Sequence, residues 1–262
     1  MTVAGVLMVK DEADIIAGTL THLAGEVDFL LVADNASTDG TREILAELAD
    51  LLPLTVVDDP DPAYYQSRKM SALAQQAAEA GATWIVPADA DELWFGEHAI
   101  RKLAADAHGN VLTAALFDHR PTAIDPDDVD PFRSMVWRDD QPLALPKVAF
   151  RWEPGATIHQ GNHGVTLPHG ERPEAALQIR HFPNRTAEQF VRKARNGAAA
   201  YAVTDLDFAV GQHWREWGAL LDRVGETAFI DEVYRRWYWF LAPVEAGLVH
   251  DPAPYLRWKE QP

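Results

Sequence analysis

The chain has 262 residues, of which 47% are hydrophobic and none is cysteine, and its formal net charge is −17. This length can bury a full core without covalent staples, either as one large domain or as a domain with an appendage. The lack of cysteine excludes disulfides, thiolate chemistry and cysteine-based zinc sites. The acidic balance argues against a nucleic-acid partner, because nucleic-acid phosphates require a basic face.

The first third of the chain alternates short apolar runs with amphipathic stretches. Residues 3–9, 29–33, 54–57 and 84–86 read as strands, and the segments between them contain helices. Asp11 is expected to cap the first helix, and the helix over residues 66–80 is expected to end at Gly81. Four strands that alternate with helices predict βαβ units and a mostly parallel α/β sheet flanked by helices.

This regular alternation breaks after residue 94. Further strands are expected at 111–117, 147–152, 156–159, 165–167 and 176–182, with a helix at 98–107. Residues 118–138, where aspartates are interrupted by prolines, read as a mobile surface loop. Thr186 begins a helix with Gln189 at its third position, which matches a capping box. We expect one domain over residues 1–205, divided near residue 95, and an aromatic-rich helical extension over residues 206–262.

Two carboxylates follow the strand predicted at residues 84–86. Asp89 and Asp91 are spaced i, i+2, and Glu92 comes directly behind them. In open α/β sheets ligands bind beyond the carboxyl ends of the strands. Hard oxygen ligands at such a place suit Mg²⁺ or Mn²⁺, which one or two carboxylates often hold together with substrate phosphate. An ordinary acidic loop is the alternative, because short motifs also match by chance.

Three polar motifs follow the predicted strands in a fixed order. They are Lys10-Asp11-Glu12, Asp34-Asn35-Ala36-Ser37-Thr38-Asp39-Gly40-Thr41 and Asp89-Ala90-Asp91. Together they resemble the nucleotide-sugar half of a GT-A glycosyltransferase and are similar to glycosyltransferase family 2. The resemblance covers about residues 3–94 and continues more loosely, through residues 179–186, to about residue 197. It implies a Rossmann-like GT-A fold and the transfer of a sugar from a nucleotide diphosphate sugar to a hydroxyl.

The resemblance also implies roles for single residues on the donor side. Asp34 would contact the nucleoside base or ribose, and Asp11 would belong to the same nucleotide site. Asp91 would bind a divalent cation, Mn²⁺ or Mg²⁺, that bridges the donor diphosphate, and Asp89 would contact the ribose or the metal. Arg68 matches a position whose arginine often lies near the base or phosphate. The rival interpretation of Arg68 is a solvated helix residue.

A histidine and a group of basic residues follow the last predicted strand. The resemblance implies that His181 is a further metal ligand, although a lone histidine is more often structural. Five of the chain's 23 basic residues fall within 16 positions around it, a concentration that fits a diphosphate site and includes Arg185. These residues are Arg180, Arg185, Arg192, Lys193 and Arg195. Arg192 and Arg195 also fit an ordinary basic helix face.

The base that accepts the proton of the acceptor is less well marked. Family 2 enzymes usually invert and use an Asp or Glu for this step, but the corresponding region, residues 155–164, contains no such motif. His163 is flanked closely by glycines and has a suitable ordinary pKa, so we expect it to be the general base. His159, Glu153 and Asp118 are the other candidates. A retaining enzyme would need no such base, so the departure leaves the stereochemistry open.

Two other functions fit parts of the pattern. A nucleotidyltransferase would normally show a glycine-rich basic loop after the first strand, where this chain has Lys10-Asp11-Glu12. A non-catalytic module that binds a nucleotide sugar is the other alternative. The acceptor is expected to be a sugar, a lipid-linked or a small-molecule hydroxyl. The aromatic tail has two interpretations: core packing of terminal helices, which we favour, or a surface that stacks on lipid or sugar, with peripheral membrane contact. No apolar run approaches the ~20 residues of a membrane span, and the amino terminus lacks a basic leader, so we expect a soluble cytoplasmic protein.

Overall fold

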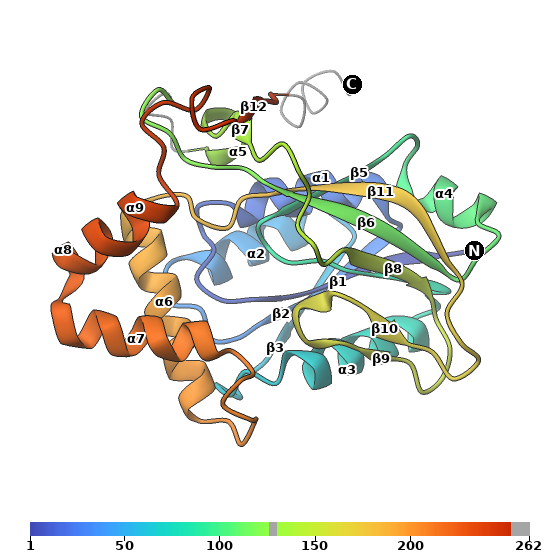
Figure 1. Cartoon of the computed structure of the whole chain (residues 1–262). Helices are drawn as coiled ribbons and strands as arrows, with labels where there is room; N and C mark the ends of the chain where they lie inside the picture. Colours follow the sequence, from blue (N-terminus) through green and yellow to red (C-terminus); the bar gives the residue numbers. More distant parts are fainter. Residues whose placement is uncertain (126–129, 253–262) are drawn as a thin grey trace.

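A computed structural model describes residues 1–125 and 130–252 (Figure 1). Its centre is an eight-stranded sheet in the order β3-β2-β1-β4-β8-β6-β11-β5. The strands are β1 (Val3–Val9), β2 (Phe29–Asp34), β3 (Leu54–Asp58), β4 (Trp84–Pro87), β5 (Glu92–Gly96), β6 (Val111–Asp118), β8 (Lys147–Arg151) and β11 (Pro173–His181). β1–β4 are parallel to one another, and β6 and β11 run the same way because β8 is antiparallel to both β4 and β6.

The strand directions bring chemically active residues to one edge of the sheet. Six strands end at this edge, among them β2 at Asp34, β6 at Asp118 and β11 at His181. β5 and β8 run in the opposite direction, so they begin there, at Glu92 and Lys147. Residues from all parts of the chain therefore meet beyond the carboxyl ends of the parallel strands, where ligands bind in open α/β sheets.

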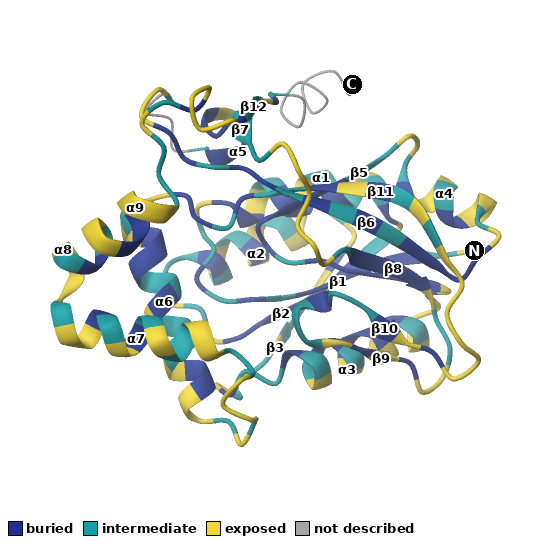
Figure 2. Ribbon diagram, in the orientation of Figure 1, coloured by how far each residue is buried: buried dark blue, intermediate teal, exposed yellow. Residues whose placement is uncertain are grey.

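Helices cover both faces of the sheet. Helices α1 (Ile16–Glu26), α2 (Thr41–Ala49) and α4 (Ile100–Asp106) share one hydrophobic cluster with the sheet, and α3 (Gln66–Glu79) shares another on the opposite face. A small hairpin of β9 (Thr157–Ile158) and β10 (Val165–Thr166) packs beside α3. Central strands such as β1 and β4 are buried between these layers (Figure 2). The expected alternation of strands and helices in the first third is confirmed.

The last part of the chain forms a helical group at one end of the sheet (Figure 1). It contains α6 (Ala187–Ala202), α7 (Gln212–Val224), α8 (Glu226–Phe229), a π-helical turn (Ile230–Tyr234) and α9 (Arg235–Trp237). α6 and α7 pack against each other, and Phe190 and Phe229 lie in the hydrophobic cluster of this group. Thr186 caps α6, with its hydroxyl accepting from the Gln189 amide at 3.1 Å, but the Gln189 side chain accepts from the Arg185 amide instead of closing the capping box.

Three local expectations differ from the structure. Asp11 does not cap α1, which begins at Ile16. The backbone of Asp11 is left-handed (φ 55°), and the Asp11 carboxylate accepts hydrogen bonds from the amide of Thr38 and the side chain of Asn196. The interval 118–138 is not simply a surface loop, because α5 (Pro131–Ser134) and β7 (Trp137–Arg138) lie in it and Phe132 is buried; Asp127 and Asp128 lie outside the described residues. β5 was not expected at all.

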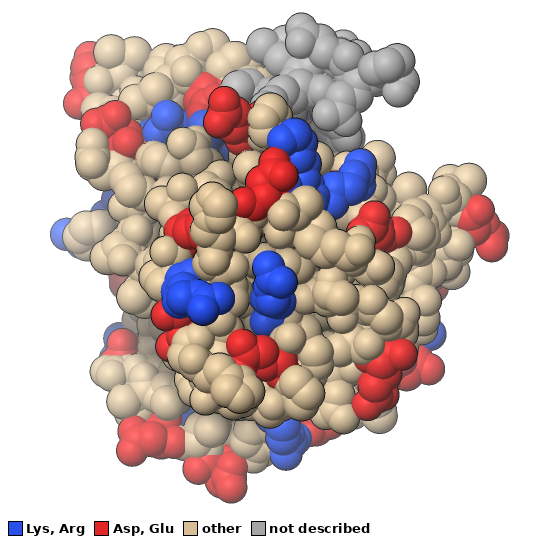
Figure 3. Space-filling model, turned by 90° about the vertical axis from the view of Figure 1, so that its right-hand side faces the viewer, with Lys and Arg blue, Asp and Glu red and all other residues tan. Residues whose placement is uncertain are grey.

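The surface is acidic overall but not uniformly so. Acidic and basic side chains are interspersed on the face shown in Figure 3.

None of the helices described in residues 1–125 and 130–252 is both long and apolar enough to cross a membrane. A short pairing of β7 with β12 (Val249–His250) brings the end of the described chain back to the 137–138 segment.

Candidate active site

A cavity of about 430 Å³ opens at the edge of the sheet where the parallel strands end. Its walls come from the loops after β1, β4 and β11, from the start of β8, and from helices α6 and α7. Residues with ionisable side chains that line it are Lys10, Asp11, Glu12, Tyr64, Asp89, Asp91, Asp118, Lys147, His163, His181, Arg192, Lys193, Tyr201 and His213. The cavity therefore joins the first and second halves of the chain.

Asp91 lies at the centre of the polar part of this cavity. Its Oδ2 accepts from Lys193 Nζ at 2.8 Å, and its Oδ1 lies 3.5 Å from His181 Nε2. Burial alone would raise the pKa of the Asp91 carboxyl, but the charges of Lys193, His181 and Arg185 hold it well below its usual range. Asp91 is therefore ionised and buried, with one oxygen on a lysine and the other facing an imidazole.

Asp118 fixes the orientation of His181. The two residues are register partners at the ends of β6 and β11, and His181 Nδ1 lies 2.7 Å from Asp118 Oδ1. Asp118 also forms an ion pair with Arg120, whose Nη2 lies 3.4 Å from Asp118 Oδ2. Burial lowers the pKa of His181, but Asp91 and Asp118 outweigh it and raise the value to about 10. A carboxylate on one ring nitrogen leaves the other, Nε2, aimed at Asp91.

The Asp91–His181 pair fits a divalent cation. Metal-bound histidine typically donates its second ring N–H to a carboxylate, as His181 does to Asp118. A metal at this point would have to displace the proton held on Nε2. Across residues 1–125 and 130–252, no three His, Asp or Glu side chains form a metal-binding group. Asp91 and His181 are the two side chains here that could serve as ligands, and a metal held by two protein ligands would take its other ligands from phosphate and water.

Asp89 has a different environment, although it is only two residues away. Its Oδ2 is 2.5 Å from Lys147 Nζ, while its Oδ1 accepts from Asn162 at 2.8 Å and from Gln66 at 3.3 Å. Lys147 also pairs with the fully buried Glu92 at 2.9 Å. Both oxygens of Asp89 are thus engaged by protein donors, so the geometry favours Asp91 over Asp89 as the metal ligand.

His163 lines the same cavity and is half-buried. Its Nδ1 is 3.2 Å from the carbonyl of Pro146, which can only accept, so the neutral ring carries its proton on Nδ1 and keeps a lone pair on Nε2. Burial, reinforced by the charge of Lys147, lowers the pKa of His163. The ring packs closely against Gly161, where a Cβ would lie 2.5 Å from Cδ2 and 2.9 Å from Nε2. His163 is therefore mainly neutral at pH 7 and carries its lone pair on Nε2.

The comparison with protein families identifies the chain. The model of glycosyl transferase family 2 matches residues 6–152, which is more than half of the sequence. The chain belongs to glycosyl transferase family 2. It is a glycosyltransferase, and the family and the GT-A fold class expected from the sequence are both confirmed. This family membership favours glycosyl transfer over nucleotidyl transfer and over a non-catalytic module.

Solved structures give more distant likenesses. Residues 1–349 of S. aureus TarS in complex with UDP are 13% identical, with a TM-score of 0.42, and the match covers 90% of this chain and 77% of that one. The same fragment with UDP-GlcNAc is 14% identical, with coverage of 90% and 78% and a TM-score of 0.42. A mycobacterial protein is 20% identical over 45% of this chain and 41% of its own, with a TM-score of 0.31. No curated protein matches the chain.

The remaining donor-side residues of the glycosyltransferase are not all at the cavity. Asp11 lines it and bonds to Asn196 of α6 at 2.7 Å. Asp34 is buried nearby, where it accepts from the Ser37 amide at 3.3 Å and lies 3.6 Å from Arg42, but it is not among the lining residues. Arg68 is not brought to the cavity: its side chain is 66% exposed and pairs with Asp61.

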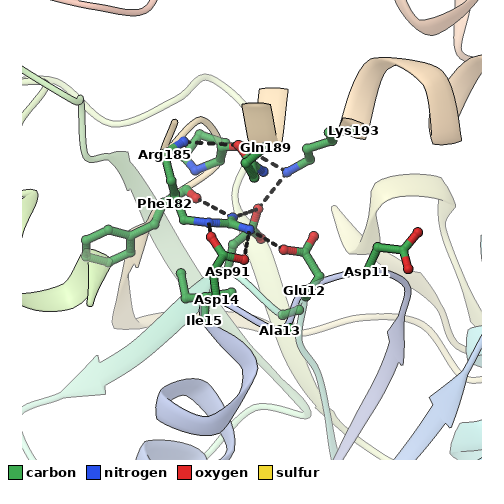
Figure 4. A network of polar contacts seen from close by, with 12 residues as sticks. Asp11, Glu12, Ala13, Asp14, Ile15, Asp91, Phe182, Arg185, Gln189 and Lys193 are labelled. Atoms are coloured by element: carbon green, nitrogen blue, oxygen red, sulfur yellow. Dashed lines mark hydrogen bonds and ion pairs between the residues drawn. The ribbon is translucent and has the colours of Figure 1, made fainter. Parts of the chain in front are cut away.

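Arg185 lies behind the cavity wall rather than in it. Its guanidinium is buried and bonds to Glu12 and Asp14 from the loop after β1, as Figure 4 shows. It also donates to the Phe182 carbonyl at 3.0 Å and lies 3.9 Å from Asp91. Arg185 thus ties the loop after β1 to the segment after β11 and adds positive charge near Asp91. A direct contact with the donor is not what this geometry favours.

Three of the four base candidates are disfavoured by their surroundings. Asp118 is committed to His181 and Arg120, and although burial raises its pKa, His181 and Arg120 bring the net shift below the usual value. Glu153 pairs with His169 and does not line the cavity. His159 bonds to Thr166 at 2.9 Å and likewise lies outside the lining. His163 is the candidate that lines the cavity and carries a lone pair on a ring nitrogen, Nε2, that the contact with Pro146 does not use.

Sequence reasoning missed two lysines of the site. Lys147 begins β8 and Lys193 lies on α6, and each pairs with one aspartate of the Asp89-Ala90-Asp91 motif. Lys193 was noticed only as one of a basic group. The position of Lys147 at the start of a buried strand is a signal, because a buried lysine needs an anionic partner. The sequence alone does not identify that partner.

Proposed function

We propose that this glycosyltransferase moves a sugar from a nucleotide diphosphate sugar to an acceptor hydroxyl, uses a divalent cation and inverts the anomeric centre. The observation that carries the proposal is that His181 and Asp118, paired at the ends of β11 and β6, meet Asp91 of the loop before β5, with Nε2 of His181 3.5 Å from Asp91 Oδ1. This arrangement provides two metal ligands and the residue that orients one of them.

On the donor side, Asp91 and His181 would hold Mn²⁺ or Mg²⁺. Such a metal, when bound, offsets the charge that develops on the leaving nucleoside diphosphate. Lys193 lies against Asp91 and lines the cavity, so its ammonium group presents a further positive charge to the same diphosphate. Asp11 and Asp34, at the ends of neighbouring strands β1 and β2, would accept hydrogen bonds from the nucleoside.

On the acceptor side, His163 would accept the proton of the attacking hydroxyl on Nε2. The Pro146 carbonyl holds the required tautomer, and the lowered pKa keeps the ring neutral at the working pH. A base on the acceptor face is what an inverting displacement needs, because the hydroxyl attacks opposite the leaving group. Lys147, whose charge contributes to the lowered pKa of His163, pairs with Asp89 and Glu92 in the same part of the site.

A thermal-shift screen tests the donor half of the proposal. Nucleoside diphosphates are added with and without Mn²⁺, because a ligand that binds only the folded state raises the melting temperature by mass action. We expect one base to give a shift that depends on Mn²⁺. The absence of any nucleotide response with the metal present would overturn the proposal.

The stereochemical half needs a separate measurement. Once the donor is found, the product formed with a hydroxyl acceptor is followed by NMR from the first turnovers, before the anomers equilibrate. We expect the product to have the configuration opposite to that of the donor. Retention would remove His163 from its role while leaving the metal and donor assignments intact.

A further inference from the structure

The cavity has an aromatic side that the donor chemistry does not use. His213, Trp214 and Trp217, here called the aromatic wall, all come from α7 and all line the cavity that also contains Asp91 and His163. Their ring centroids lie 4.7–5.4 Å apart, and the two indoles are nearly perpendicular, with an interplanar angle of 87°. Both tryptophans keep part of their surface exposed, although α7 packs against α6.

The wall is rigid because its rings are supported from behind. Trp214 lies directly over Gly197 of α6, where a Cβ would come within 2.6 Å of the indole. Trp217 packs on Phe190 and Tyr238, with centroid distances of 5.1 and 6.0 Å. Rings held in this way lose little conformational entropy when a ligand stacks on them. The geometry is therefore that of a preformed binding face.

The neighbours of the wall indicate what it binds. The same stretch of α6 presents Arg192, Lys193 and Asn196 to the cavity, so the aromatic faces are bordered by hydrogen-bonding groups. These groups already have protein partners, but an alkyl chain laid over them would take them out of water and offer no hydrogen bond in return, at a cost in free energy. A pyranose ring has C–H groups on its faces and hydroxyls around its edge, and it satisfies both kinds of neighbour.

We propose that the aromatic wall is the acceptor subsite and that the acceptor is a carbohydrate. One ring of the acceptor stacks on the indole of Trp214, with the perpendicular indole of Trp217 at its edge, and presents a hydroxyl toward His163 in the same cavity. This inference rests on the proposed function. It assigns the acceptor to α7, which lies beyond residues 6–152, the part that the family model matches.

The test compares three tryptophan variants. Trp214→Ala and Trp214→Phe alter the wall, and Trp237→Ala is the matched control, because Trp237 is 62% exposed on α9 and does not line the cavity. Two ligands are titrated into each protein. One is a set of methyl glycosides of glucose, galactose and N-acetylglucosamine, followed by saturation-transfer NMR, and the other is the nucleoside diphosphate with Mn²⁺, followed by calorimetry.

We expect at least one glycoside to bind the wild type and the Trp237→Ala variant equally. Trp214→Ala should weaken this binding about tenfold, because the apolar face on which the sugar stacks is removed. Trp214→Phe should recover part of it, which a merely unfolded variant would not show. Nucleotide affinity should stay the same in all three variants.

Each other outcome has a definite meaning. Loss of nucleotide affinity in Trp214→Ala would overturn the inference, because the indole would then stack on the nucleobase. Glycoside binding that is absent, or unchanged by Trp214→Ala, would also overturn it. If glycosides bind at Trp214 but no nucleoside diphosphate binds with Mn²⁺, the proposed donor chemistry fails while the carbohydrate subsite stands.

Discussion

The two aspartates of one motif, Asp89 and Asp91, belong to two different polar groups. Asp91 has one oxygen on Lys193 and one facing His181 across 3.5 Å. Asp89 has both oxygens occupied, by Lys147, Asn162 and Gln66. Asp91 therefore shares one oxygen with an imidazole, a possible metal ligand, whereas all the partners of Asp89 are ammonium or amide N–H groups, which cannot bind a metal in these forms. Two aspartates only two residues apart can therefore have different roles. The strands and helices that supply their hydrogen-bond partners determine which role each one has.

The largest effect that would test this comparison is expected for Asp91→Asn. The substitution keeps the size of the side chain but removes the charge that holds the metal. Transfer should fall about 10³-fold or more, because a catalytic metal supplies several kcal/mol of charge stabilisation. Steady-state transfer with Mn²⁺ measures this loss. Asp106→Asn, at an exposed position on α4, is the control. Near-normal turnover that still depends on metal would contradict the assignment of Asp91.

His163→Ala tests the acceptor side. Removing a general base typically costs ~10²–10⁴-fold, so transfer should fall by that range while donor affinity stays near the wild-type value. Hydrolysis of the donor without acceptor should change little. His159→Ala is the matched control, because His159 lies four residues away, bonds to Thr166 and does not line the cavity. Equal losses in both variants would show that the loop is disturbed and that no base has been removed.

Asp118→Asn addresses the orientation of His181. An amide in this position cannot hold the Nδ1–H of His181 as a carboxylate does, and loss of such a partner typically lowers metal affinity ~10–100-fold. Calorimetric titration of Mn²⁺ without donor gives this affinity independently of activity. Asp139→Asn removes the other partner of Arg120 and should leave Mn²⁺ affinity unchanged. If both variants lose affinity alike, Arg120 and not Asp118 is the determinant.

Asp89→Asn should show the reverse pattern. Lys147 would keep Glu92 but lose the charge of Asp89, so the free energy of unfolding should fall by about 1.5–3 kcal/mol, the usual worth of a hydrogen bond to a charged group. Denaturant unfolding measures the loss, and Mn²⁺ titration should give almost the wild-type affinity. A large drop in Mn²⁺ affinity with unchanged stability would make Asp89 a metal ligand after all.

The sequence predicted the first half of the site better than the second, for a physical reason. Asp11, Asp34, Asp89 and Asp91 follow strands whose apolar patterns are local and easy to recognise, so their shared edge could be predicted. The partners come from far along the chain: Lys147 is 58 residues from Asp89, and Lys193 is 102 residues from Asp91. Local patterns cannot identify such pairs, because they depend on which strands and helices become neighbours.

Two residues show the same limit at closer range. The resemblance leaves Arg68 either near the nucleotide or on a solvated helix face, and in the structure it pairs with Asp61 and contacts the Tyr65 ring at the surface. Phe132 lies inside the interval expected to be a mobile loop, but it packs edge-on against Phe182 with a distance of 4.8 Å between the ring centroids. In both cases a tertiary partner outweighed the local pattern. The aromatic tail was read in two ways from the sequence, and α7 shows that its inner residues line the cavity.

The smallest expected effect is a shift in the pH profile. Burial, reinforced by Lys147, lowers the pKa of His163 below its ordinary value of 6.5. The neutral ring is the active form and exists above this pKa, so kcat/KM should be constant around pH 7 and decline only as the pH falls through the lowered value. The profile is measured at saturating Mn²⁺, so that protonation of His181 does not limit the rate. His159→Ala should keep this acidic limb, whereas the residual activity of His163→Ala should lack it. An acidic limb centred above 6.5 would mean that His163 carries a proton at neutral pH and that another group is the base.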